Sequence, residues 1–278
     1  MITANTMTSQ SVGIFDLVGF TLKAHTAGQR MALGAYTILS LVDHFVRRKL
    51  KFLPWRLPYS LVSDVTVSTA WGAFHCRKST SDGWIAGPLF EPTTRTYLKR
   101  VMTTGVFVDV GSHMGRYAVE MARHLRENGR VVAIEPHPQN FQALKRNIEL
   151  NELKNVVAVN SGCWSCSGSL RLVGADDGAT ISHEQGLHGH MVPVITVDEL
   201  IIDRLQLAAI AILKIDVEGA EAEVLRGARR VIESSPRLNV VFEALDDAAL
   251  ERVADILTPS GFKIERLSWK NFVAFREQ

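Results

Sequence analysis

Four ionisable residues end an apolar run in the stretch LKIDVEGAE, residues 213–221: they are Lys214, Asp216, Glu218 and Glu221. Residues two apart on a strand point to the same face, so Lys214 and Asp216 are expected to lie side by side. A positioned carboxylate can orient a substrate hydroxyl and help remove its proton. We therefore interpret Asp216 as a candidate base or acceptor-orienting group, with Glu218 as its partner and Lys214 beside them.

The same charges also have a purely structural interpretation. Acidic residues are common at helix starts, where they accept hydrogen bonds from free N–H groups and the dipole favours negative charge. Gly219 would let the chain turn sharply, which places Glu218 and Glu221 in the first turn of the following helix. In that interpretation the lysine and the aspartate form only a salt bridge at the end of the strand. Glu243 ends a later strand in the same crevice and is a further candidate.

A glycine-containing turn in VFVDVGSHMGRY, residues 106–117, has the pattern of a nucleotide-binding loop. A strand ending near Asp109 is followed by a turn from Gly111 to Gly115 and then by a helix. Dinucleotide sites need a glycine in the middle of this turn, but His113 stands there, which disfavours close packing against two phosphates. S-adenosylmethionine fits better, because its carboxylate can bind N–H groups of the turn and its cation can face Asp109.

Glu135 ends the next strand, twenty residues beyond Gly115. At about this spacing an acidic residue reaches the ribose hydroxyls of a bound nucleoside. The turn and the glutamate in this order predict an adenosine-containing ligand more specifically than either does alone. The structural alternative is that Asp109 caps the helix and Glu135 is a solvated strand end.

Alternating strands and helices must position these residues. The apolar segments GVFVDV, RVVAIE, NVVAV and AAIAILKID are separated by helical patterns, which indicates a parallel sheet with helices on both faces. A helix over 218–235, a strand over 238–245 and a helix over 246–257 follow. Two segments near the C-terminus, GFKIERL and NFVAFRE, predict an antiparallel pair. We expect a doubly wound, Rossmann-like α/β sheet, mostly parallel, with an antiparallel C-terminal strand.

The region before this sheet divides into two parts. Residues 1–58 are predicted to form a helical extension, helical over 11–52, and 59–92 a β lead-in of short strands, before the main domain at 93–278. The predicted helix has apolar residues at helical spacing and a basic end. It fits a helix packed on the main domain, an amphipathic anchor on an anionic membrane, or a dimer contact.

Two segments contain residue types that can bind a metal ion. Cys163 and Cys166 form a CxxC pair, but no second pair completes a zinc site and no helix follows to make a redox motif. The glycine-rich segment 174–193 carries three histidines without a clear period, so we expect a long loop beside the site. We predict no metal.

Composition sets broad limits on the class of protein. The 278 residues are 46% hydrophobic and 22% charged with a formal net charge of +2, which favours a globular fold and gives no general grip on nucleic acid. Three cysteines and the lack of a secretory signal pattern favour the cytoplasm. The uncharged run from Met31 to Val42 is shorter than the ~20 residues of a spanning helix.

From about Gly83 to Ala244 the sequence resembles the FkbM-type family of S-adenosylmethionine-dependent methyltransferases. Five blocks carry the resemblance, the last of them the most specific: FEP, FVDVGSHMGRY, VVAIEPHPQNFQALKRNIELN, VITVDEL and LKIDVEGAEAEVLRGA. The resemblance implies the family's fold and methyl transfer from S-adenosylmethionine. It implies that the methionine end of the donor is held by Asp109, Gly111, Ser112, His113 and Gly115.

The resemblance also assigns the adenosine end of the donor. Glu135 would bind the ribose, and Pro136 would turn the chain out of the strand. The family usually has a small or amide residue at the position of His113 and a polar or acidic residue in the adenine-facing turn. Here that turn reads SGCWSCSG, so Cys163 lies there and Trp164 is the residue that could stack on the adenine.

The leading hypothesis for function is O-methylation of a hydroxyl on a sugar-like or small-molecule acceptor, by analogy with the family. Amide nitrogen acceptors also occur among similar proteins. An RNA methyltransferase is the first alternative, disfavoured by the modest charge and the absence of an NPPY-like tetrapeptide. The second alternative is a non-catalytic binding or membrane-associated protein that retains the fold. The oligomeric state stays open.

Overall fold

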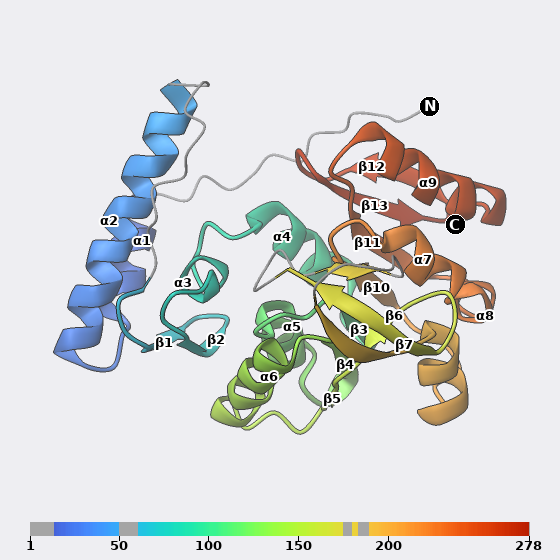
Figure 1. The fold of residues 1–278 in the computed structure, drawn as a ribbon, viewed down its shortest axis with the longest axis horizontal. Helices are drawn as coiled ribbons and strands as arrows, with labels where there is room; N and C mark the ends of the chain where they lie inside the picture. The colour runs from blue at the N-terminus through green and yellow to red at the C-terminus, as the bar shows by residue number, and fades with distance from the viewer. Residues whose placement is uncertain (1–13, 50–60, 175–179, 183–188, 278) are drawn as a thin grey trace.

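A seven-stranded sheet forms the centre of the computed structural model, which describes residues 14–49, 61–174, 180–182 and 189–277 (Figure 1). Five neighbouring strands are parallel, and the strand nearest the C-terminus inserts antiparallel between two others. This confirms the predicted doubly wound α/β fold and its C-terminal antiparallel pair. The spatial order is β12 (Lys263–Arg266), β13 (Asn271–Phe275), β11 (Asn239–Glu243), β10 (Ile212–Ile215), β3 (Gly105–Val110), β4 (Gly129–Ile134) and β5 (Val156–Val159).

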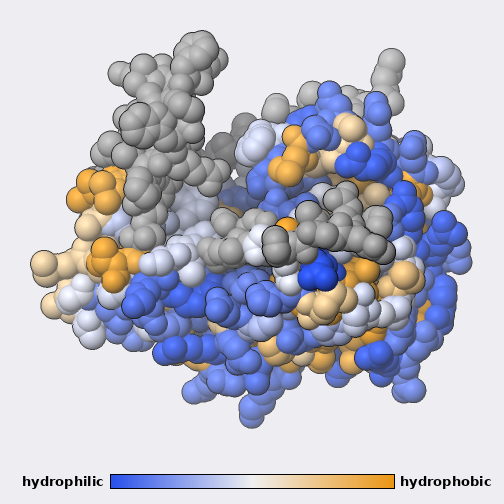
Figure 2. All heavy atoms as spheres, viewed as in Figure 1, coloured by the Kyte–Doolittle hydropathy of each residue, from blue (hydrophilic) through white to orange (hydrophobic). Residues whose placement is uncertain are grey.

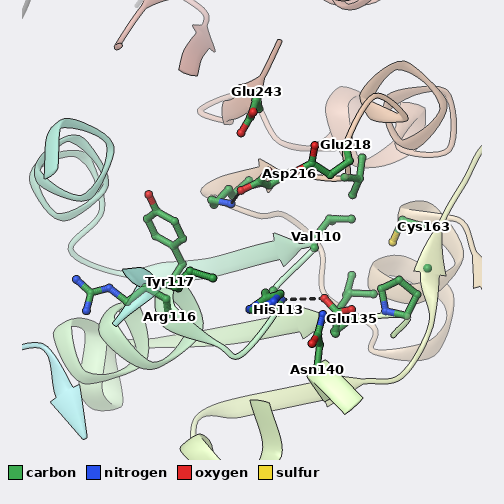
Figure 3. A pocket seen from close by; sticks show the side chains of 18 of the residues that line it. Val110, His113, Arg116, Tyr117, Glu135, Asn140, Cys163, Asp216, Glu218 and Glu243 are labelled. Atoms are coloured by element: carbon green, nitrogen blue, oxygen red, sulfur yellow. Dashed lines mark hydrogen bonds and ion pairs between the residues drawn. The ribbon is translucent and has the colours of Figure 1, made fainter. Parts of the chain in front are cut away.

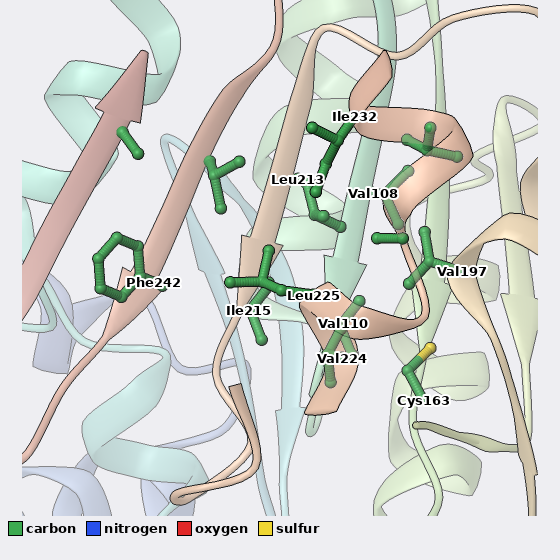
Figure 4. Close-up of a cluster of buried hydrophobic side chains, with 14 of the residues drawn as sticks. Val108, Val110, Cys163, Val197, Leu213, Ile215, Val224, Leu225, Ile232 and Phe242 are labelled. Carbon is green, nitrogen blue, oxygen red and sulfur yellow. The ribbon is translucent and has the colours of Figure 1, made fainter. Parts of the chain in front are cut away.

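Helices cover both faces of this sheet because its strands are apolar on both sides. One cluster joins Val108 and Val110 of β3 to helices that follow β10 and β11, as Figure 4 shows for part of it. Phe107, the residue before Val108, faces the opposite cluster. The first set is α7 (Glu221–Arg226), α8 (Arg229–Ser234) and α9 (Asp247–Leu257); the second is α4 (Pro92–Val101), α5 (Arg116–Leu125) and α6 (Pro138–Leu150).

The N-terminal part packs against the second set of helices. Its elements are α1 (Ile14–Leu22), α2 (Ala27–Lys49), β1 (Val65–Thr69), β2 (Gly72–Cys76) and α3 (Asp82–Ile85). Leu33 of α2 and Phe74 of β2 share a buried cluster with Val119 of α5. Asn147 of α6 and Asn151, the residue after this helix, accept hydrogen bonds from backbone N–H groups of β2, both at 2.8 Å.

The predicted continuous helix over 11–52 is wrong in one respect. Residues 23–26 separate α1 from α2, because Ala24 leaves the helix and forms an isolated bridge with Val67 of β1. The short strands expected over 59–92 are not found at residues 82–85, which form the short helix α3. Asp82 stabilises this turn by accepting three hydrogen bonds from Arg77.

The loop predicted over 174–193 is largely replaced by strands where the structure describes it. A second sheet of four strands lies beside the carboxyl edge of the central sheet (Figure 1). Its members, in order, are β6 (Gly162–Cys163), β9 (His190–Ile195), β7 (Gly168–Val173) and β8 (Thr180–Ser182). His190 lies in β9 and is exposed, whereas His183 and His188 lie outside the described residues.

A single helix predicted over 218–235 is instead two helices, α7 and α8. Gly227 separates them, and a Cβ atom on this residue would lie 2.2 Å from the carbonyl oxygen of Trp164. The close approach of another backbone therefore interrupts the helix. Three further short turns complete the described part: η1 (Arg126–Asn128), the π-helical η3 (Glu199–Arg204) and η4 (Thr258–Ser260).

Helices α1 and α2 carry exposed apolar side chains as well as buried ones. Leu22, Met31, Ile38 and Leu39 are exposed, and Figure 2 shows apolar side chains gathered at the left edge of the molecule, where these helices lie. In the described part of the chain, no helix combines the length and the apolar character needed to cross a membrane.

Candidate functional site

A cavity of about 270 Å³ opens at the carboxyl ends of the central strands. Open parallel sheets bind ligands at this edge, where the strand order reverses. Figure 3 shows that the acidic residues from the ends of β10 and β11 lie on one side of the cavity, and His113 with Glu135 on another. Nine predicted site residues line the cavity: Lys214, Asp216, Glu218, Gly111, Ser112, His113, Glu135, Pro136 and Cys163.

The glycine turn after β3 is shaped by close packing. Gly111 has φ +83°, and a Cβ atom there would lie 1.8 Å from the carbonyl oxygen of Asp216. Gly115 has φ +87°, and its Cβ atom would lie 2.5 Å from Leu144. Gly111 lines the cavity and Gly115 does not. Both positions need glycine because the turn packs closely against the end of β10 and against α6, where a Cβ atom would clash. This requirement comes from packing within the protein and not from contact with a ligand.

The N–H groups of this turn are already engaged within the protein. The N–H groups of Gly111 and Ser112 donate to the carbonyl oxygen of Ile134, and that of Gly115 donates to Ser112. His113, which has φ +50°, donates its N–H to Glu135. Each of these four N–H groups has a protein acceptor, and the binding of a donor carboxylate by the turn stays a prediction.

Glu135 binds the backbone around it on the side of the cavity where His113 lies. Its carboxylate accepts the N–H of His113 at 2.8 Å and the N–H of His137 at 2.8 Å. Burial raises the pKa of Glu135, although the two N–H groups act in the opposite direction. A carboxylate offers about four acceptor positions, so two remain for other partners. Glu135 is a buried, cavity-lining acceptor and not a solvated strand end.

Lys214 links the two predicted acidic groups. Its Nζ atom lies 3.0 Å from Oδ2 of Asp216 and 3.8 Å from Oδ1 of Asp109, its direct partner in the parallel register. It also lies 4.6 Å from the centre of the Tyr117 ring. Burial disfavours the ammonium, but Asp216 and Asp109 outweigh burial and raise the pKa of Lys214. Lys214 is therefore a fixed cation.

The two aspartates differ in access to the cavity. Asp216 lines it, and Lys214 outweighs burial to hold the pKa of Asp216 below its ordinary value. Asp109 is 1% exposed and does not line the cavity. Burial raises the pKa of Asp109 even though Lys214 opposes the shift. Asp109 therefore acts on the cavity through Lys214.

The turn after β10 separates the two glutamates of the opening motif. Glu218 has φ +54°, lines the cavity and lies before α7, so its predicted place in the first helical turn is wrong. Glu221 is the first residue of α7 and is buried. It accepts the N–H groups of Gly219 at 3.1 Å and Val217 at 3.4 Å. Glu221 thus fixes the turn that presents Glu218.

Several cavity residues had no predicted role. Glu91 lies in the FEP block, accepts the hydroxyl of Tyr117 at 2.5 Å and accepts Nδ2 of Asn271 at 3.0 Å. Lys270 lines the cavity beside Glu243, with an Nζ–Oε1 distance of 2.6 Å. The quoted FEP block was a local signal for Glu91, whereas nothing near Lys270 in the sequence pointed to it.

The wall nearest β6 is less polar. Ser161, Gly162, Cys163 and Ile181 line it, but Trp164 is not among the lining residues. Trp164 is instead buried in a small cluster with Val194 and Ala220, which removes the geometric basis for its predicted stacking on adenine.

The cysteines show no sign of shared chemistry. Burial raises the pKa of Cys163 to about 12, which leaves an inert thiol, while Cys166 is exposed. Both are free. Among the residues that the structure describes, no group of three or more His, Cys, Asp or Glu side chains is placed to hold a metal ion.

A family model described as the methyltransferase FkbM domain matches residues 109–264, more than half of the chain. The match begins at Asp109 and includes the end of β3 and all of β4, β10 and β11, whose ends form the cavity. It therefore covers most of the residues assigned above.

Two relatives are similar over part of the chain. The hexuronic acid methyltransferase AglP of Haloferax volcanii is 29% identical over 145 residues, which cover 52% of this chain and 58% of the relative. The methyltransferase sdnD of Sordaria araneosa is 28% identical over 193 residues and is covered to 74% of its length. The chain thus spans under two thirds of the first of these relatives.

One solved structure aligns with most of this chain. The methyltransferase FkbM from Methylobacillus flagellatus KT aligns over 94% of this chain and 58% of its own, with 16% identity and a TM-score of 0.46.

Proposed function

The chain belongs to the methyltransferase FkbM domain family, and we propose that it transfers a methyl group from S-adenosylmethionine to a hydroxyl of a sugar-like acceptor. One observation carries this proposal. A single cavity joins the buried acceptor Glu135 on one side to the lysine–carboxylate group of Lys214, Asp216 and Glu218 on the other. The first side suits a ribose and the second suits an acceptor hydroxyl.

The cavity fits S-adenosylmethionine through its side chains. Glu135 keeps acceptor positions for the ribose hydroxyls, and the wall of Gly162, Cys163 and Ile181 offers an apolar surface for the adenine. Because the turn N–H groups are engaged, a donor carboxylate needs a cationic side chain. Arg116 lines the cavity and is the cation that follows the turn in sequence.

The chain's own residues then have distinct tasks. Bound S-adenosylmethionine supplies an electrophilic methyl group. Asp216 and Glu218 orient an acceptor hydroxyl by accepting its hydrogen bonds, and Lys214 fixes Asp216 in its ionised state. The ammonium of Lys214 is itself held in place by the carboxylate of Asp109 and by its contact with the Tyr117 ring. This rigid support is what aligned displacement requires.

The polar side of the cavity supports a sugar-like acceptor. Four carboxylate residues and two lysines line it, which together can accept and donate hydrogen bonds to several hydroxyls. The similar protein named a hexuronic acid methyltransferase supports the same class of acceptor. These six residues are Glu91, Asp216, Glu218, Glu243, Lys214 and Lys270.

The exposed apolar residues of α1 and α2 support a further partner. We also propose that this face, defined by Leu22, Met31, Ile38 and Leu39, contacts an anionic membrane surface. The chain sequence continues from these residues into Arg47, Arg48 and Lys49 at the end of α2. A helix whose sequence combines apolar residues with a basic end is typical of interfacial helices.

Donor binding by calorimetry tests the main proposal. We expect S-adenosylmethionine to bind the wild type and to bind Glu135→Gln at least about tenfold more weakly, which is about 1.4 kcal/mol. The exposed Glu149 provides the matched control, and Glu149→Gln should bind as the wild type does. Absence of donor binding by the wild type contradicts the proposed function.

A transfer assay addresses the acceptor. With radiolabelled S-adenosylmethionine, we expect label to enter glucuronic acid or a glucuronide more than a ribo-oligonucleotide. Preferential labelling of the oligonucleotide, with binding that weakens steeply as salt rises, would favour an RNA methyltransferase instead.

A further inference from the structure

Glu243 is held at the rim of the cavity by its neighbour across the sheet. It ends β11 opposite Asn271 of β13, and the N–H of Ala244 donates to the carbonyl oxygen of Lys270 at 2.9 Å. This pairing places Nζ of Lys270 2.6 Å from Oε1 of Glu243. Glu243 is only 4% exposed, yet it lines the cavity, while the Lys270 side chain is 27% exposed and reaches solvent.

Asp216 and Glu243 are therefore the two candidates for the carboxylate that accepts the proton of the acceptor hydroxyl. Asp216 is bound by a lysine whose charge is permanent near neutrality, which lowers its affinity for a proton. A general base works best when its pKa lies near the working pH. Asp216 fits an orienting group better than a base.

We propose that Glu243 is the catalytic base of the methyl transfer, a role that rests on the proposed function. In the reaction, the acceptor oxygen forms a bond to the methyl carbon as the carbon–sulfur bond breaks, and the bonding electron pair stays on sulfur. The hydroxyl proton passes to the carboxylate of Glu243. The products are a methyl ether, neutral S-adenosylhomocysteine and a protonated Glu243, which returns its proton to solvent past Lys270.

The surroundings of Glu243 adjust its affinity for the proton. Burial raises the pKa of Glu243 to about 8, and the negative charges of Asp216 and Glu218 add to this effect. Lys270 opposes them, and Glu91 lies near enough to raise the pKa of Lys270. Glu243 thus gains and loses its proton close to physiological pH, whereas Asp216 stays ionised.

The pH dependence follows from the sign of this shift. A base works in its deprotonated form, so the rate should rise with pH through about 8. Lys270→Met removes the cation that stabilises the Glu243 carboxylate, so the rising limb should move to higher pH. A purely structural role for Lys270 would lower the rate without moving the limb.

The test combines donor affinity, turnover and a spectroscopic titration. Glu243→Gln should bind S-adenosylmethionine within about threefold of the wild type. Its kcat with glucuronic acid should fall at least about 100-fold, within the range for loss of a base. In protein labelled with carboxyl-¹³C glutamate, one signal should titrate near pH 8 in the wild type and be missing from Glu243→Gln.

Each result has a definite meaning. Wild-type-like kcat in Glu243→Gln, or the absence of any glutamate signal that titrates above about pH 6.5 and disappears in this variant, overturns the role of Glu243. Because the titration and donor binding need no acceptor, they give an answer even when glucuronic acid is not methylated. Loss of donor binding in the wild type, by contrast, counts against the proposed function.

Discussion

Asp216 keeps its negative charge in a partly buried position because the ammonium of Lys214 lies 3.0 Å away. We predict that Asp216→Asn lowers kcat at least about tenfold while the dissociation constant for S-adenosylmethionine stays within about threefold. The amide keeps the shape of the side chain but loses the charge that fixes the lysine.

Turnover and calorimetry on the same preparations check this prediction. Asp203→Asn, which changes an exposed aspartate paired with Arg230, is the matched control and should behave as the wild type. Wild-type-like turnover in Asp216→Asn would refute the orienting role.

Individual site residues were predictable where the chemistry is local. Lys214 and Asp216 lie side by side because a strand repeats every two residues, and that period is visible in the sequence. Glu91 and Lys270 could not be assigned in the same way. Glu91 is held by a hydrogen bond from Asn271 of β13, and Lys270 is placed by the pairing of β13 with β11; both contacts join segments far apart in the sequence. Trp164 shows the converse, since backbone contacts with Gly227 and packing decide its direction.

At the scale of elements, Asp198 joins the VITVDEL block to helix α8. Its carboxylate accepts the N–H groups of Arg230 at 3.0 Å and Val231 at 2.9 Å, and its own N–H donates to the carbonyl oxygen of Gly227. A side chain from another segment therefore caps the start of α8.

We predict that Asp198→Ala lowers the free energy of unfolding by about 1–2 kcal/mol, the usual value of such a cap. Asp203→Ala is the matched control: its salt bridge with Arg230 is exposed, so the loss should be clearly smaller than in Asp198→Ala. Denaturant unfolding followed by circular dichroism measures both. Equal losses in the two variants would contradict the capping role.

The elements of the central sheet were largely predictable, because long apolar periods give a strong signal. The exceptions have tertiary causes. Helices α7 and α8 separate where the carbonyl group of Trp164 approaches Gly227. Strand β8 has only three residues and forms by pairing with β7. No local period could reveal either feature.

At the scale of the whole molecule, the exposed face of α1 and α2 gives a separate prediction. We expect the double variant Met31→Ser and Ile38→Ser to co-sediment less with phosphatidylserine-containing vesicles than the wild type. These side chains are 76% and 63% exposed, so the substitutions should spare the fold. Each removed apolar side chain weakens partition by roughly 1–2 kcal/mol.

Val62→Ser is the matched control, because Val62 is 82% exposed but lies outside these helices. Equal recovery of the wild type and the double variant in the vesicle pellet would remove the membrane proposal. Donor binding should be the same in all three proteins.

The insertion of β13 between β11 and β12 has a consequence for biosynthesis. The cavity takes residues from Trp84 through Lys270, and the tie between Glu91 and Asn271 joins segments 180 residues apart. A nascent chain can assemble the Glu135 side early, but the opposite wall forms only after β13 has left the ribosome. Until then the edge of β11 is unpaired and open to wrong partners. Chaperone dependence should therefore be greatest just before β13 leaves the ribosome.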